Sequence, residues 1–116
     1  MYRGYNIAME NFKDYHDFTG SNPEKFFKST LFQSEHLLLG LNCLEPGQSQ
    51  SMHAHEAQDK FYFVLEGQGE FTIGAESQAA GPGCVIWAPA GEIHGVTNQG
   101  EERLVVLIGI APSPGK

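Results

Sequence analysis

The sequence predicts an all-β fold, a sandwich or a barrel. Short apolar runs of about five to nine residues recur from residue 33 onward, the length typical of strands. Fourteen glycines and six prolines fall mostly between these runs. This rhythm favours strands joined by turns over alternating strands and helices. The runs cover residues 36–44, 60–65, 70–73, 85–88 and 103–110, with a shorter one at Val96.

The length of 116 residues fits one compact domain. We expect residues 1–34 to form an N-terminal arm and residues 35–112 to form the barrel domain. Within the arm, Asn22, Pro23 and Glu24 have the order of a helix start, because asparagine caps, proline tolerates the first turn and glutamate suits the helix dipole. A short helix over residues 23–28 is therefore expected, and an irregular turn is the alternative.

Charge narrows the classes of partner. Fourteen acidic residues against seven basic ones give a net charge of −7. Nucleic acids and anionic membranes both demand basic surfaces, so we expect neither. No apolar run approaches the roughly 20 residues of a membrane span, and the N-terminus has no signal core. We expect a cytoplasmic protein whose Cys43 and Cys84 are small buried side chains rather than a disulfide.

Two histidines, His53 and His55, are separated by one residue. In an extended strand, residues two apart point to the same face. Two imidazoles placed in this way can bind one cation, as they do in many zinc sites. One such pair is weak evidence by itself. His16 and His36 have no similar context and are expected at the surface.

A second pattern supplies a third histidine. Pro89 and Gly91 form a turn signal directly before His94, so this side chain can point inward from the next strand. The full pattern is a glycine, five residues, Pro-x-Gly, two residues, a histidine, three residues and an asparagine. It is matched by Gly83, Pro89, Gly91, His94 and Asn98.

These two patterns resemble the two conserved motifs of the cupin superfamily. The first motif is matched by Gly47, His53, His55 and Gly67, and the second is complete. The resemblance covers about residues 35–110. It implies a double-stranded β-helix, or jelly-roll, barrel of two antiparallel sheets. It also implies that His53, His55 and His94 hold a metal inside the barrel.

One position departs from the family pattern. Where a cupin has a glutamate ligand, this chain has Lys60, which as a cation repels a metal. Gln58 can take over as a neutral fourth ligand, Asp59 can do so through a one-residue bulge, or the site has three histidines only. We favour three histidines with Gln58 nearby. Lys60 can then turn aside to pair with Glu56 or Glu70.

Lys60 and Tyr62 lie two residues apart on the same predicted strand, so both can face the metal cavity. They are the candidate acid–base residues. Large apolar residues near the motifs are expected in the core, some of them facing the cavity. These are Met52, Tyr62, Phe71, Ile73 and Trp87.

The function predicted in this way is that of a metal-dependent enzyme acting on a small organic molecule. Imidazole ligands suit iron, nickel, zinc, copper or manganese. A three-histidine site favours a dioxygenase, whereas an added oxygen ligand favours an isomerase or lyase of sugars or keto acids. The alternative is a non-catalytic module that binds a sugar or another small molecule, with or without a metal. Residues 61–65 are apolar on both strand faces, which predicts a homodimer.

Overall fold

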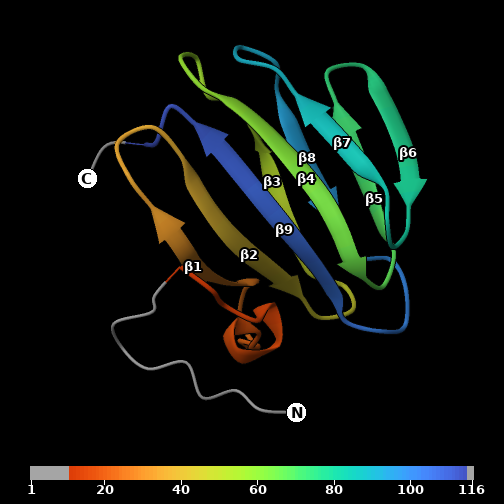
Figure 1. Cartoon of the computed structure of the whole chain (residues 1–116). Helices are drawn as coiled ribbons and strands as arrows, with labels where there is room; N and C mark the ends of the chain where they lie inside the picture. The colour runs from red at the N-terminus through yellow and green to blue at the C-terminus, as the bar shows by residue number, and fades with distance from the viewer. Residues whose placement is uncertain (1–10, 115–116) are drawn as a thin grey trace.

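The computed structural model describes residues 11–114, so the beginning of the expected arm lies outside it. Two antiparallel sheets pack face to face, one of five strands in the order β1-β2-β9-β4-β7 and one of four in the order β3-β8-β5-β6 (Figure 1). This arrangement confirms the predicted jelly roll. The strands are β1 (Phe27–Gln33), β2 (Leu38–Leu44), β3 (Ser49–His53), β4 (Asp59–Glu66), β5 (Gly69–Ile73), β6 (Glu76–Ala80), β7 (Val85–Ala88), β8 (His94–Thr97) and β9 (Leu104–Ala111).

Alternation along β4 builds the interior of the barrel. Lys60, Tyr62 and Val64 are buried, whereas Phe61 and Phe63 are half-buried on the other face. Successive strand residues point to opposite faces, so one face of β4 lines the space between the two sheets. Tyr62 and Val64 belong to the main core cluster with residues of β2, β5, β8 and β9.

The expected helix over residues 23–28 is wrong. The Asn22 side chain does accept a hydrogen bond from the backbone N–H of Glu24, at 2.9 Å, but the chain then extends into β1. Phe27 pairs with Cys43 of β2, and this tertiary pairing outweighs the local start signal. The first strand of the five-stranded sheet therefore comes from the segment assigned to the arm.

The only helical element described is a 3₁₀ turn, η1 (Tyr15–Phe18), which Asp14 caps. It lies against the outer face of the five-stranded sheet, beside β1 and β2 (Figure 1). Tyr15 and Phe18 pack there against a second apolar cluster made of Leu31, Leu41, Cys43 and Val105. The arm thus covers part of that face. No helix among the described residues is long and apolar enough to cross a membrane, and the cytoplasmic location stays a prediction.

Two of the expected core residues are on the surface. Met52 is 44% exposed and Trp87 is 57% exposed. Trp87 pairs with Phe61 of β4 and shares its outward face, so the opposite sheet does not cover it. Met52 lies on the edge strand β3. Tyr62 and Phe71 are buried as expected.

The cysteines are free, as predicted. Cys43 is buried, in agreement with the expectation of a small core residue, whereas Cys84 is only half-buried.

Asn98, the last residue of the second motif, links the end of β2 to the loop between β8 and β9 through hydrogen bonds. Its buried side-chain amide donates hydrogen bonds to the carbonyls of Leu44, at 2.8 Å, and Glu102, at 2.9 Å. Its side-chain oxygen accepts from the N–H of Gly100 at 2.9 Å. All of these partners are backbone groups, so this motif residue serves the fold and not the chemistry of the site.

Candidate metal centre

The three histidines come from two neighbouring strands. His53 is the last residue of β3 and His94 is the first residue of β8, and the two are partners across this strand pair. His55 follows in the loop between β3 and β4. Gly91, with φ +87°, makes the corner before β8, a backbone conformation that glycine adopts without strain. Strand register therefore brings together the two motifs.

The three rings form a tight cluster. Their centroids are 4.4 Å apart for His53 and His94, 4.9 Å for His53 and His55, and 5.4 Å for His55 and His94. One ring nitrogen from each lies within 4.8 Å of the others. Two nitrogens that are each about 2.0–2.1 Å from one zinc ion are at most about 4.2 Å apart, so the rings need only a small inward movement to bind a single ion. The arrangement fits one metal ion.

Hydrogen bonds at Nδ1 leave the Nε2 atoms of His53 and His94 available. Nδ1 of His53 lies 2.8 Å from the carbonyl of Ser51, and Nδ1 of His94 lies 3.1 Å from the carbonyl of Glu92. Donation from each Nδ1 places the lone pair on Nε2, which is how backbone carbonyls orient metal-binding histidines. Nε2 of His94 is buried and has no hydrogen-bond partner among the described residues. A buried nitrogen that lacks a partner in this way is well suited to bind a metal.

The electrostatics favour the neutral form of His55 and His94. Burial lowers the pKa of His94 to about 4, and the charge of Lys60 acts in the same direction. Burial, followed by the nearby His53 and Lys60, also lowers the pKa of His55. Neutral imidazole is the form that coordinates a metal, so the site is ready to bind one at neutral pH.

Lys60 lies inside the barrel, as strand parity predicts. It is 2% exposed, and its Nζ lies 4.7 Å from the centre of the Tyr62 ring. Burial, with a smaller effect of Lys28, lowers its pKa to about 8. The expected ion pair with Glu56 or Glu70 is not among the contacts of the described residues.

Tyr62 packs beside the histidine cluster inside the barrel. Its ring lies 6.2 Å from that of His94, and its hydroxyl donates to Oε1 of Gln50 at 2.8 Å. Burial raises its pKa well above the usual value. Tyr62 therefore remains a neutral hydrogen-bond donor.

The two candidates for a fourth ligand each make a hydrogen bond outside the histidine cluster. The Gln58 amide donates to the carbonyl of Pro112 at 3.1 Å. Asp59 is exposed, and its Oδ1 accepts from the N–H of Ala90 at 2.9 Å. Asp59 precedes Lys60 on β4, so it faces the opposite side of the strand. The cluster that could hold a metal among the described residues contains the three histidines and not Asp59.

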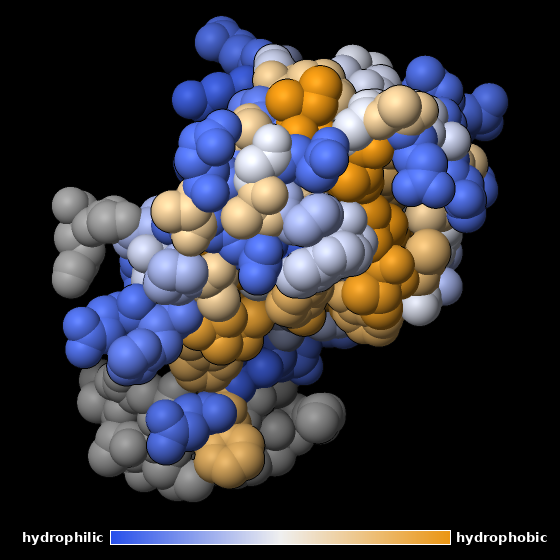
Figure 2. All heavy atoms as spheres, turned by 90° about the horizontal axis from the view of Figure 1, so that it is seen from above, coloured by the Kyte–Doolittle hydropathy of each residue, from blue (hydrophilic) through white to orange (hydrophobic). Residues whose placement is uncertain are grey.

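A cavity of about 480 Å³ adjoins the histidines, within the usual range for small-molecule sites. It lies between the edge strands β1 and β3 of the two sheets, and His53, His55 and Lys60 form part of its wall. Seen from above, this end of the molecule shows a band of apolar residues between two polar areas (Figure 2).

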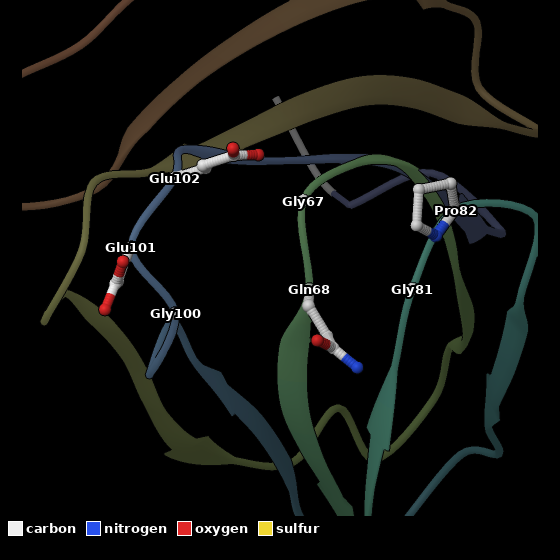
Figure 3. A pocket seen from close by; sticks show the side chains of 7 residues that line it. All are labelled: Gly67, Gln68, Gly81, Pro82, Gly100, Glu101 and Glu102. Carbon is white, nitrogen blue, oxygen red and sulfur yellow. The ribbon is translucent and has the colours of Figure 1, made fainter.

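A hollow of about 550 Å³ lies at the opposite end of β4, among the loops that join β4 to β5, β6 to β7 and β8 to β9 (Figure 3). It is larger, but no histidine or cysteine lines it. Its walls are Gly67, Gln68, Gly81, Pro82, Gly100, Glu101 and Glu102. The candidate metal site therefore lies at the other end of β4, beside the histidines.

Sequence reasoning missed five polar residues of the cavity wall, which are Lys28, Ser29, Thr30, Asn42 and Gln50. Asn42 could have been found from the sequence, because it is a lone amide within the apolar run of β2. The structure shows that it is buried. Lys28 and Gln50 lie on strands whose faces cannot be assigned from alternation alone.

Comparison with known proteins identifies the family. The family model described as the cupin domain matches residues 40–110. The chain belongs to the cupin family. This cupin is similar to the crystal structure of TT1209 from Thermus thermophilus, with a TM-score of 0.86 and 42% identity over 89% of this chain and 98% of that one.

Two curated relatives are also similar. The uncharacterized protein SCO3923 of Streptomyces coelicolor is 32% identical over 76 residues, which are 66% of this chain and 71% of the relative. The oxalate-binding protein of Thermotoga maritima is 33% identical over 64 residues, 55% of this chain and 53% of the relative.

Proposed function

We propose that this cupin holds one divalent transition metal through His53, His55 and His94, and that it acts with this metal on a small organic molecule in the adjoining cavity. The observation that carries the proposal is the buried Nε2 of His94, which lacks a partner among the described residues. A buried polar atom left unpaired costs roughly 1–3 kcal/mol. A metal bound by the three rings removes that cost.

The bound metal would supply a Lewis acid with open coordination positions for an oxygen atom of the ligand. The protein's own residues then do the rest. His53 and His94 hold their rings through backbone carbonyls. Lys60 places a cationic N–H donor at the cavity wall, where it can orient a substrate or deliver a proton. Tyr62 positions Lys60 and Gln50 rather than touching the substrate.

Of the two enzyme classes, the ligand set favours oxygen-dependent oxidation. An isomerase or lyase site was expected if an oxygen ligand joined the histidines, but Asp59 lies outside the histidine cluster, and the Gln58 amide N–H bonds to the carbonyl of Pro112. An oxygen electrode can separate the classes on a panel of keto acids and diketones. Consumption by iron-loaded but not zinc-loaded protein supports oxidation, and turnover without oxygen consumption by both forms supports the other class.

The second candidate is a non-catalytic module that binds a small acid. The name of the Thermotoga relative, an oxalate-binding protein, favours it. Titration calorimetry with oxalate, followed by product analysis, distinguishes the two. Saturable binding with oxalate recovered unchanged, and no turnover of the substrate panel, would replace the enzyme proposal.

The metal itself is tested first. Protein purified without added metal is analysed by elemental emission, together with His94→Ala and the control His36→Ala, a histidine on the surface. We expect about one transition metal per chain, lost in His94→Ala only. Wild-type protein that neither carries nor takes up such a metal would refute the proposal.

We further propose that the cupin is a homodimer. Val85 and Trp87 are 63% and 57% exposed on the outer face of the five-stranded sheet, next to Phe61 and Phe63. The described part of the arm packs on the neighbouring part of this face, through Tyr15 and Phe18. Contiguous exposed apolar surface of this kind marks association sites.

A further inference from the structure

The cavity beside the histidines has an unusual charge for this protein. The chain has fourteen acidic residues and seven basic ones, yet the cavity wall contains two lysines and no carboxylate. Lys60 lies inside and Lys28, which is exposed, lies on β1 at the edge. The complete wall is formed by Phe26, Lys28, Ser29, Thr30, Leu38, Asn42, Gln50, His53, His55, Lys60, Ile108, Ile110 and Pro114.

Lys60 is a buried cation without a counterion among the described residues. None of the ion pairs found there includes it, and its ammonium group lies against the face of the Tyr62 ring. Buried charges are normally paired, because an unpaired one loses its hydration without compensation. An anion in the cavity would supply the missing partner.

Asn42 is a second unsatisfied group on the same wall. It is 2% exposed, and its Nδ2 has no hydrogen-bond partner among the described residues. A buried side-chain amide with a free N–H requires an acceptor. Lys60 and Asn42 therefore offer an N⁺–H donor and a neutral N–H donor to the same cavity.

Resting on the metal site proposed above, we propose that the cavity binds a small dicarboxylate or keto acid. One carboxylate accepts hydrogen bonds from Lys60 Nζ and Asn42 Nδ2, and the far end of the molecule reaches the histidine-bound metal. A dication and Lys60 together carry three positive charges, with Lys28 near the mouth. A dianion offsets most of that charge, whereas a neutral ligand offsets none.

The rest of the wall favours a carboxylate over a phosphate. Phe26, Leu38, Ile108 and Ile110 supply apolar surface. A planar carboxylate has two oxygens and can satisfy both with the two donors named. A phosphate has further charged oxygens that would face apolar side chains, at a cost in desolvation.

Calorimetry with defined probes tests the proposal. Malonate is the dicarboxylate, malonamide is its neutral counterpart of the same shape, and inorganic phosphate is the competing anion. Each is titrated into zinc-loaded and metal-free protein. We expect malonate to bind at least about tenfold more tightly than malonamide, the effect of one charge-assisted contact. Equal affinities, or tighter binding of phosphate than of malonate, would overturn the proposal.

Three variants assign the contact to its residues. Lys60→Met and Asn42→Leu should each weaken malonate binding about tenfold or more, and should weaken the binding of malonamide, whose carbonyls are neutral acceptors, by a smaller factor. Lys25→Met removes the same charge from an exposed residue outside the cavity wall and should have no effect. Wild-type affinity for malonate in folded Lys60→Met would overturn the role of Lys60. Lys60→Glu should abolish malonate binding while retaining zinc.

The metal content of the same samples keeps the two proposals apart. Zinc bound at one ion per chain with no preference for malonate would leave the metal proposal standing and overturn this one. Preference for malonate in protein that takes up no metal would support the roles of Lys60 and Asn42, and the metal proposal alone would fail.

Discussion

His53 and His94 face each other as partners across β3 and β8, with ring centroids 4.4 Å apart. One residue ends its strand and the other begins its strand, so the pair sits at the rim of the four-stranded sheet. His55 completes the cluster from the loop that follows β3. The geometry of the site thus depends on one strand pairing and one turn.

Replacement of Lys60 by methionine should stabilise the metal-free protein. Burial lowers the pKa of Lys60 from 10.5 in the unfolded chain to about 8 in the folded chain. Below pH 8 Lys60 is protonated in both states, and its buried charge destabilises the folded state. A shift of this size corresponds to about 3 kcal/mol. Lys60→Met should gain about that much at pH 7, measured by urea unfolding.

The pH dependence provides the control. Between pH 8 and 10.5 the unfolded chain keeps the Lys60 proton while the folded chain loses it, so the stability of the wild type rises relative to that of Lys60→Met. The greater stability of Lys60→Met should therefore disappear near pH 10.5. Lys28, His55, His94 and the Tyr62 ring surround Lys60 and are the same in both proteins. A constant difference across the range would contradict the assignment.

Removal of the Asn98 side chain should weaken the fold without removing the metal. Asn98→Ala leaves the carbonyls of Leu44 and Glu102 without their donor, at a cost of about 3 kcal/mol. Thermal unfolding measures the loss, and Gln99→Ala, an exposed neighbour, is the control. A normal melting temperature for Asn98→Ala would refute this structural role.

The sequence was informative wherever a periodicity matched a motif. The strand runs and His53, His55 and His94 followed from spacing, and the inward direction of Lys60 followed from its parity with Tyr62. The sequence did not predict that Trp87 is exposed. Trp87 is as apolar as a core residue, and only the position of the second sheet decides which face of its strand is covered. The pairing of Phe27 with Cys43 is likewise long-range, and it overrode the helix signal at Asn22.

A charge at Trp87 tests the proposed homodimer. Trp87→Glu places a charge on the outer face of the five-stranded sheet and should convert a dimer to a monomer, because burying that charge is costly. Ile93→Glu changes an apolar residue of similar exposure, 49% against 57%, in the loop before β8, and should leave the dimer intact. Light scattering after size exclusion gives the masses. A wild-type monomer would reject the proposal.

The central claim is that His53, His55 and His94 bind one metal ion. Anomalous diffraction from crystals of the metal-loaded protein, recorded at the absorption edge of the metal, tests it directly. We predict one strong peak about 2.0–2.1 Å from a ring nitrogen of each histidine if the metal is zinc. A peak elsewhere, for example at Cys84 or beside Glu101 and Glu102, with none among the three rings, would contradict it.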